Sequence, residues 1–287
     1  MQTLWGAVSD DGGRRPVNED AVLARPPVFI VADGMGGHHY GALASHSVVR
    51  AFAEFADRID PAVPVQPAHV LEAIEHAKHL IRAGVRAARS ATESQEDPVA
   101  GSTVAGAVLT SQHGSPCWLL FNIGDSRIYR HGEGGLNQIS VDHSMVQELL
   151  DAGAITAAQA QHHPQRNVIT RAVGSTRDAE VDFWMLPAHP SQRLLLCSDG
   201  LTSEVTTAEV ARALSSPAAA DEVCTDLVRR ATLDGARDNV SVVVVDLLTE
   251  GFADQPPTST MAGAGAAAGL LDDLEDTVPR PGTGAFR

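Results

Sequence analysis

The order of the predicted elements indicates an α+β fold, in which antiparallel sheets are flanked by helices. Apolar runs typical of strands occur at residues 2–9 and 21–33, between residues 103 and 139, and again at residues 193–197 and 240–248. Amphipathic helical patterns separate these groups, and the regular strand–helix alternation of a parallel sheet is missing. The chain has 287 residues, 44% of them apolar, which is enough for one large domain or two small ones.

The N-terminal part is predicted to contain strands followed by two helices. A helix is predicted at residues 41–55, where apolar residues recur at helical spacing: Val48, Val49, Phe52 and Phe55. Pro67 suits the first turn of a second helix. One stripe of that helix is apolar at a period near 3.6, through Val70, Ile74, Ala77, Ile81, Val85 and Ala88.

Strands dominate again after a polar stretch at residues 90–100, which is predicted to be a loop. Short helices are predicted at residues 145–152 and 221–232. Gly- and Ser-rich turns separate several of the predicted strands, which lie at residues 103–109, 117–123, 127–130, 136–139, 193–197 and 240–248.

Two further helix starts are indicated by capping boxes. Thr156 with Gln159 and Thr206 with Glu209 have the required spacing, in which each side chain binds the other residue's backbone N–H. We therefore expect one helix after residue 156 and another after residue 206.

The composition changes beyond about residue 250. The stretch QPPTSTMAGAGAAAG is of low complexity, which predicts disorder for residues 251–287 and a folded domain at residues 1–250. The chain ends in an acidic segment with three leucines, LLDDLEDTVPRPG. This segment is either a solvated tail or a docking segment that becomes ordered on a partner.

Bulk composition excludes several classes of partner. The net charge is −15 and the pI is about 5.1, which disfavours binding to nucleic acid or to an anionic membrane and suits a protein that holds divalent cations. Three cysteines without a metal-binding spacing indicate free thiols in a reducing compartment. The N-terminus lacks the pattern of a signal peptide and no apolar run reaches the length of a membrane span, so we expect a cytoplasmic protein.

Four aspartates lie at the ends of apolar runs or in turns: Asp20, Asp33, Asp199 and Asp238. A carboxylate at the mouth of a buried strand is costly unless its charge is compensated, so several of them indicate a shared cation site. Oxygen ligands select Mg²⁺ or Mn²⁺. Two such ions, about 3.5–4 Å apart, can hold a water between them and lower its pKa. The Asp-Gly pairs at Asp11 and Asp234, by contrast, are predicted to be ordinary turns or caps.

Arg15 is a candidate phosphate ligand. It lies four residues before Glu19, and a guanidinium can bind phosphoryl oxygens through two parallel hydrogen bonds. If the surrounding motif is ignored, Arg14 and Arg15 are equally well explained as a solvated pair in a loop.

Eight segments in a fixed order give the chain its family resemblance. They are RPVNEDA at 15–21, VADGMGGHHYGALAS at 31–45, GSTVAGAVL at 101–109, NIGDSRIYR at 122–130, ISVDHSMV at 139–146, NVITRAVG at 167–174, CSDGL at 197–201 and RDNVSVVVV at 237–245. Together they span roughly residues 3–249, and they resemble the bacterial form of the metal-dependent serine/threonine protein phosphatases, the PPM or 2C-type family.

The resemblance implies a fold and an activity. The fold would be a central antiparallel β-sandwich with helices on both sides, in four αββα layers, with a small flap at about residues 145–166. The activity would be hydrolysis of phosphoserine and phosphothreonine by direct attack of a metal-bridging water or hydroxide, with no phosphoenzyme. The implied partners are phosphorylated proteins, among them bacterial Ser/Thr kinases and their substrates, and the protein is expected to be a monomer.

The resemblance also implies roles for individual residues. Asp33 would bridge two Mn²⁺ or Mg²⁺ ions, and Gly34 would offer its backbone carbonyl to one of them. Asp199 and Asp238 would complete the first metal site. The remaining implied roles are second-metal acids for Glu19 and Asp20, a weaker third-metal ligand for Asp125, phosphate binding for Arg15 and orientation of the site for Asn239.

Some residues near the implied site depart from the family pattern. Met35 stands where some eukaryotic members have a histidine proposed as general acid. Ser203 stands where many members have an aspartate that helps to hold the third metal, and the side chain of Glu204 is expected to point elsewhere. His38 is an open candidate for assisting proton transfer.

Other functions can be weighed against this one. Cys224 and Arg230 have the C-x5-R spacing of cysteine-based phosphatases, but the residues between them contain no glycine and lie in a predicted helix. A phosphoprotein-binding module that has lost activity would lack a metal-binding acid. All four aspartates at the ends of apolar runs or in turns are present: Asp20, Asp33, Asp199 and Asp238. A metal-dependent hydrolase of small phosphate esters remains open, because the metal ligands alone do not distinguish it.

Overall fold

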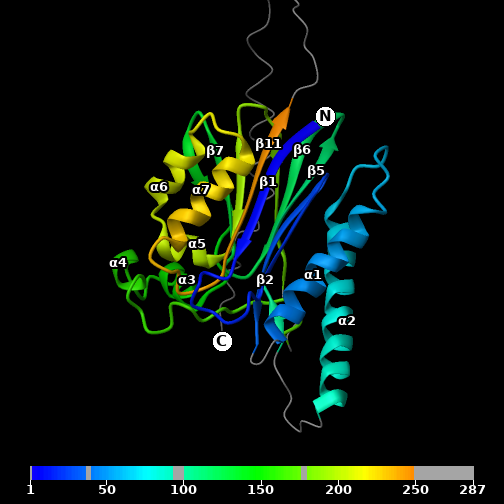
Figure 1. The fold of residues 1–287 in the computed structure, drawn as a ribbon. Coiled ribbons are helices and arrows are strands. Elements are labelled where there is room, and N and C mark those ends of the chain that lie inside the picture. The colour runs from blue at the N-terminus through cyan, green and yellow to red at the C-terminus, as the bar shows by residue number, and fades with distance from the viewer. Residues whose placement is uncertain (1, 37–39, 93–99, 176–179, 249–287) are drawn as a thin grey trace, which may run out of the picture.

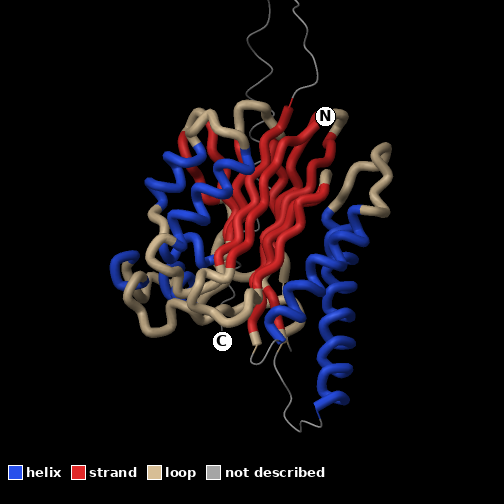
Figure 2. The backbone as a smooth tube through the Cα atoms, in the orientation of Figure 1, coloured by secondary structure: helices blue, strands red, loops and turns tan. Residues whose placement is uncertain are grey.

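Two antiparallel β-sheets packed face to face form the centre of the molecule (Figures 1 and 2). The computed structural model describes residues 2–36, 40–92, 100–175 and 180–248. The predicted tail at residues 251–287 and the candidate His38 lie outside these described residues.

The first sheet has the order β1-β11-β10-β7-β8. Its strands are β1 (Gln2–Asp10), β11 (Val240–Leu248), β10 (Arg193–Cys197), β7 (Arg127–Gly132) and β8 (Gly135–Gln138). The second sheet has the order β2-β3-β5-β6-β9, and a short β4 pairs with β3. Its strands are β2 (Asp20–Arg25), β3 (Val28–Met35), β4 (Gly101–Ser102), β5 (Val104–Gln112), β6 (Ser115–Ile123) and β9 (Asp182–Pro187).

Helices cover the outer face of each sheet (Figure 1). The second sheet is covered by α1 (Tyr40–Ala56) and α2 (Pro67–Thr92). The first is covered by α5 (Asp199–Glu204), α6 (Thr207–Leu214) and α7 (Ala220–Thr232). Two short helices, α3 (Met145–Asp151) and α4 (Ala157–Ala160), lie beside one end of the sandwich (Figure 1).

The central strands are apolar without interruption because both of their faces are buried. On β3, Val28 and Ile30 pack beneath α1 and α2, whereas Phe29 and Val31 face the other sheet. The strand β11 alternates in the same way, with even-numbered valines toward the α7 side and odd-numbered ones between the sheets. Alternate residues therefore belong to different core layers, as the period of a strand requires.

The structure confirms the predicted four-layer α+β fold. It also confirms both capping boxes, in which Thr156 binds Gln159 and Thr206 binds Glu209. Three elements were not predicted from the sequence: the two-residue β4, β9, which is only partly buried, and α5, whose Asp-Gly start resembles a turn. Among the described helices, none combines the length and hydrophobicity of a transmembrane span.

Candidate metal centre

The topology gathers five aspartates at one end of the two sheets, the lower end in Figure 1. Asp20 is the first residue of β2 and lies directly opposite Asp33 in the pairing with β3. Asp199 begins α5 just after β10, and Asp238 lies two residues before β11. Asp125 lies in the turn between β6 and β7, where the chain passes from one sheet to the other. Residues that are far apart in the sequence thus meet at one edge of the sandwich.

Asp20 is buried and lacks sufficient compensation for a charge. Among the described residues, its Oδ2 atom is one of three buried side-chain oxygen or nitrogen atoms without a hydrogen-bond partner. Burial, together with the charges of Asp199 and Asp238, raises the pKa of Asp20 to about 7, although the hydroxyl groups of Ser241 and Ser198 act in the opposite direction. A cation beside Asp20 would satisfy the orphaned oxygen and reverse this shift.

Asp33 and Asp199 show the same crowding. Burial raises the pKa of Asp33 well above its ordinary value, and neighbouring aspartates, Asp20 first among them, add to the effect. Burial and the charge of Asp238 raise the pKa of Asp199, which also shares a side-chain hydrogen bond with Asp33. The backbone around Asp33 is fixed by Thr103, whose Oγ1 accepts the Asp33 N–H at 3.0 Å. The site therefore holds more negative charge than its own residues neutralise.

Asp125 faces a cavity of about 730 Å³ between the aspartates and the α3–α4 segment. Its Oδ1 atom is a second orphaned buried oxygen within the described part of the chain. Burial, followed by the charges of Asp199 and Asp142, raises the pKa of Asp125 to about 7. The cavity is also lined by Asp199 and Asp238, so it gives a substrate access to the acidic cluster.

The chemistry of these groups fits hard divalent cations. Carboxylate and carbonyl oxygens are the preferred ligands of Mg²⁺ and Mn²⁺. The backbone at Gly34 is so close to its neighbours that a Cβ there would lie 2.1 Å from Gly41 O and 2.6 Å from Glu19 O. This position therefore requires glycine, and the Gly34 N–H binds Glu19 O at 3.1 Å.

The acids do not already form a coordination shell. Within the described residues, no three His, Cys, Asp or Glu side chains are grouped as a ready-made metal site. Asp33 instead contacts Asp199, and Asp238 contacts Arg15. Binding of ions would therefore require these carboxylates to exchange their present partners for the cations.

Arg15, the candidate phosphate ligand, lies at the rim of the acidic cluster. Its Nη2 donates to Asp238 Oδ2 at 2.7 Å and its Nε donates to the Arg237 carbonyl at 3.3 Å. About half of its side chain is exposed, so it can also reach a ligand in solvent. The neighbouring Arg14 points elsewhere and binds the Asp234 carbonyl.

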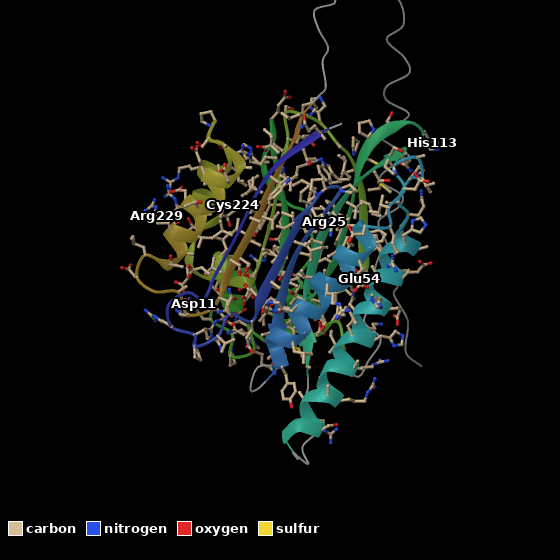
Figure 3. The ribbon with its side chains drawn as sticks, turned by 45° about the vertical axis from the view of Figure 1, so that its right-hand side comes forward. Asp11, Arg25, Glu54, His113, Cys224 and Arg229 are labelled. Carbon is tan, nitrogen blue, oxygen red and sulfur yellow. The ribbon has the colours of Figure 1, made fainter. Side chains whose placement is uncertain are left out.

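Asn239 joins three segments of backbone around the site. Its Oδ1 accepts the Glu19 N–H at 2.9 Å, and its Nδ2 donates to the carbonyls of Asp11 and Val17. Asp11 lies in the loop at this end of the molecule (Figure 3). Through these contacts Asn239 holds the loop that carries Glu19 and leads into Asp20 at the start of β2.

The residues that depart from the family pattern occupy distinct places. Ser203 lines the cavity beside Asp125 and Asp199. Glu204 does not: its carboxylate accepts the Arg237 N–H and lies 3.4 Å from the guanidinium, so its side chain points away as expected. Met35 ends β3, opposite Gly101 of β4.

Cys224 is unsuited to nucleophilic chemistry. It is fully buried between α7 and the first sheet, and burial raises the pKa of its thiol to about 12 (Figure 3). Arg230 instead pairs with Asp226 on the outer surface of α7. A thiolate with a neighbouring phosphate-binding arginine is therefore absent here, which excludes the cysteine-based alternative.

Comparison with known proteins assigns the family. A family model described as protein phosphatase 2C matches residues 14–242. The chain belongs to the protein phosphatase 2C family. The family resemblance read from the eight segments is thus confirmed.

Individual relatives agree with this assignment. The serine/threonine protein phosphatase PstP of Mycobacterium tuberculosis is 36% identical over 280 residues, covering 98% of this chain and 51% of the relative. A crystal structure of PstP/Ppp from that organism has a TM-score of 0.75 at 34% identity, covering 86% of this chain and 99% of the other. The PstP catalytic domain in complex with two manganese ions has a TM-score of 0.67 at 32% identity, covering 85% and 97%. The chain therefore spans about half the length of the curated relative.

Proposed function

We propose that this chain is a metal-dependent protein phosphatase that removes phosphate from serine and threonine side chains of proteins. The observation that carries the proposal is the convergence of five aspartates at one end of a 2C-type sandwich, four of them with raised pKa values. Such a cluster is costly unless cations compensate it, and a phosphorylated side chain needs the same cations for its own charge.

Two cations, Mn²⁺ or Mg²⁺, would be held by the predicted ligands. Asp33, Asp199 and Asp238 would hold one, and Glu19, Asp20 and Asp33 the other. The Gly34 carbonyl would bind one of the two, and Asp125 would be available to a weaker third. Support comes from the orphaned oxygens of Asp20 and Asp125 and from the two manganese ions in the PstP catalytic domain. When bound, such ions supply Lewis-acid activation of water and neutralise phosphoryl charge.

The chain's own residues would position the phosphate group. The Arg15 guanidinium, already at the rim beside Asp238, can turn its remaining donors to two phosphoryl oxygens. Asn239 would keep Glu19 and Asp20 in place through its backbone contacts. The cavity between the aspartates and the α3–α4 segment is large enough for a phosphorylated side chain and part of its peptide.

The wider setting is also a proposal. Residues 1–250 would form the catalytic domain, with a flap at about residues 145–166 that contains α3 and α4. The substrates would be phosphorylated proteins, including Ser/Thr kinases and their targets. A monomeric, cytoplasmic enzyme would suit these substrates.

A single experiment tests the activity: hydrolysis of a phosphothreonine peptide and of a small aryl phosphate, each with Mn²⁺ and with a chelator. We expect Mn²⁺-dependent release of phosphate, with kcat/KM higher for the peptide. A preference for the aryl phosphate would instead favour the small-ester hydrolase. Retention of the phosphopeptide without hydrolysis would favour a binding module and contradict the proposed function.

A further inference from the structure

The turn that carries Asp125 is fixed on both sides of one residue, Gly124. Gly124, directly before Asp125, has a φ of 103°, and a Cβ there would lie 2.5 Å from the side chain of Thr103. Its N–H donates to Nδ1 of His143 at 3.0 Å. Its carbonyl accepts from the backbone N–H of His143 at 2.9 Å and from Nδ2 of Asn122 at 3.1 Å. A single residue, His143, thus binds Gly124 from both sides.

The hydrogen bonds also fix the tautomer of His143. Because Nδ1 accepts a backbone N–H, it carries no proton, and the ring proton lies on Nε2. Nε2 lies 3.1 Å from Asp182 Oδ2 on β9 and 3.2 Å from Arg171 Nη1. Because a guanidinium can only donate, the Nε2 proton is directed to the Asp182 carboxylate. Arg171 Nη1 donates to Asp182 Oδ1 at 3.0 Å. The imidazole is only 6% exposed, so its hydrogen bonds lie in a protein interior where they are stronger than in water.

Asp182 is charged and therefore a strong acceptor for this network. Burial alone would raise the pKa of Asp182, but its contacts with His143 and Arg171 outweigh burial and hold that pKa below its ordinary value. Arg171, Asp182, His143 and Gly124 then form one connected chain of donors and acceptors that leads from β9 to the turn before Asp125.

His143 also lies where the α3–α4 segment joins the sandwich. The next residue, Ser144, is the N-cap of α3, and the His143 carbonyl accepts the Thr170 N–H at 2.9 Å. Ser144 and Ile169 form an isolated β-bridge. Both ends of the segment that would form the flap are therefore tied to the same residue that binds Gly124.

We propose that His143 is a positioning residue that fixes the Asp125 carboxylate toward the acidic cluster and couples it to the base of the α3–α4 segment. The proposal rests on the proposed function, because it assumes that Asp125 serves a divalent cation. His143 itself would touch neither the cation nor the substrate. It would act through the Gly124 peptide, as residues behind a metal ligand do when they orient it.

Two substitutions separate the two nitrogens of the imidazole. In His143→Asn, the amide oxygen can occupy the place of Nδ1 and still accept the Gly124 N–H, while the contact with Asp182 is lost. In His143→Gln, the amide nitrogen can reach the place of Nε2 and still donate to Asp182, while the acceptor for Gly124 is lost. The two variants are therefore matched controls for each other.

The experiment compares wild type, both His143 variants, Asp125→Asn and the double variant Asp125→Asn/His143→Gln. Mn²⁺ binding is measured by calorimetry, and kcat and KM for a phosphothreonine peptide are measured against Mn²⁺ concentration. We expect His143→Gln and Asp125→Asn each to weaken the same Mn²⁺-binding step by roughly 10–100-fold. His143→Asn should lose less, and the double variant should lose little more than Asp125→Asn alone.

Three outcomes would overturn the proposal: equal effects of Asn and Gln, independent and multiplicative effects in the double variant, or unchanged Mn²⁺ binding in Asp125→Asn. Should His143→Gln fail to fold, ¹⁵N NMR of the wild-type protein decides, because the proposal requires a neutral Nε2–H imidazole and a Gly124 amide protected from exchange. Wild type that binds Mn²⁺ but hydrolyses no phosphopeptide would refute the proposed function, while these binding measurements would still test His143.

Discussion

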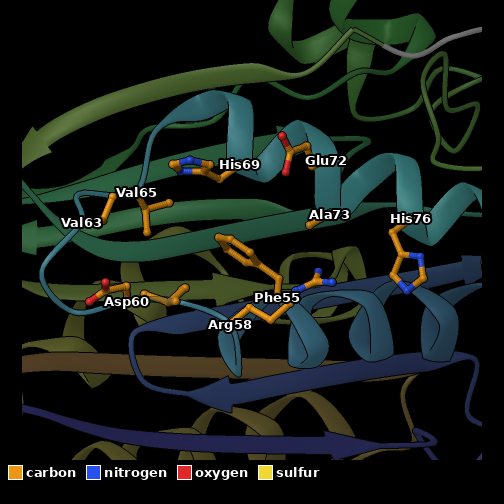
Figure 4. Close-up of a pocket in the computed structure, with 10 residues that line it drawn as sticks. Phe55, Arg58, Asp60, Val63, Val65, His69, Glu72, Ala73 and His76 are labelled. Atoms are coloured by element: carbon orange, nitrogen blue, oxygen red, sulfur yellow. The ribbon is translucent and has the colours of Figure 1, made fainter.

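At two cavities of similar size, the pKa values of acidic side chains are shifted in opposite directions. One, of about 590 Å³, lies between the end of α1 and the start of α2 and is lined by Phe55, Val65 and His76 among others (Figure 4). Beside it, Glu54 accepts from Arg50 at 2.9 Å and from His76 at 2.8 Å, and these hydrogen bonds lower its pKa. In the other cavity, of about 730 Å³, Asp125 and Asp199 have raised pKa values.

The difference lies in where the compensating charge comes from. Glu54 has hydrogen-bond partners within the chain, the Arg50 guanidinium and the His76 imidazole. At the acidic end, Arg127 is already engaged by Asp142 through three hydrogen bonds, and Arg15 forms its ion pair with Asp238. Asp20 and Asp125, each with an orphaned oxygen, and the crowded Asp33 depend on charge from outside the protein. A carboxylate that the fold leaves without a partner is thus a better indicator of a ligand site than the size of a cavity.

The largest effect is expected for Asp33, which would contact both cations. Asp33→Ala should lower kcat by at least about a thousandfold, because both ions lose a shared ligand. Circular dichroism and the melting temperature should show that the fold persists. The matched control is Glu54→Gln, which removes a paired acid beside the other cavity and should leave kcat unchanged. Near-normal turnover by Asp33→Ala would contradict the bridging role.

The pH dependence of stability should distinguish the two kinds of acid. Asp20 has a folded-state pKa of about 7 against an ordinary value of 3.8. Between those values the folded state binds more protons than the unfolded state, so stability falls as the pH rises toward and through 7. In chelator, Asp20→Asn should therefore be more stable than wild type at pH 8, by about 1–3 kcal/mol or roughly 2–10 °C in Tm, with the difference vanishing toward pH 4.

A control of opposite sign sharpens this test. Hydrogen bonds from Arg230 and Arg229 lower the pKa of Asp226 on α7, so Asp226→Asn should slightly destabilise the protein at pH 8. Added Mn²⁺ should reverse the order at the acidic end, because wild type gains binding free energy that Asp20→Asn partly loses. Thermal unfolding in chelator and in Mn²⁺ across this pH range checks both expectations. A more stable wild type in chelator at pH 8 would contradict the uncompensated state of Asp20.

A smaller effect on catalysis is expected for Arg15. Arg15→Ala should raise KM for the phosphothreonine peptide by roughly tenfold, because one charge-assisted contact to the phosphoryl group is lost. Arg14→Ala is the matched control, since Arg14 binds the Asp234 carbonyl instead. Steady-state kinetics at saturating Mn²⁺ measure both variants. Equal kinetics for the two variants would remove Arg15 from the site.

The sequence predicted the fold well because its signals are local. The run VFIVA before Asp33 and the run of valines after Asn239 are long enough to indicate buried strands. That these strands belong to one sandwich, with their aspartates at a shared site, was implied by the family motifs. The short α5 was missed because it begins with Asp-Gly and has no apolar stripe. His143 was missed because its partners are distant: Gly124 is 19 residues away and Asp182 is 39 residues away. Such a network leaves no periodic pattern in the sequence. The one available signal was that His143 lies between Asp142 and Ser144 in a family motif.

The smallest expected effect concerns the capping box that begins α6, which lies on the outer layer away from both cavities. Thr206 Oγ1 accepts the Glu209 N–H, and Glu209 in turn accepts the Thr206 N–H at 3.0 Å. Thr206→Ala should cost about 1 kcal/mol of stability, because the Glu209 N–H in the first turn of the helix loses its side-chain acceptor. Its kcat, KM and Mn²⁺ binding should equal those of wild type. A change in any of them would mean that a shift of α6 displaces α5 and with it Asp199. The acidic end would then not be independent of the outer helices.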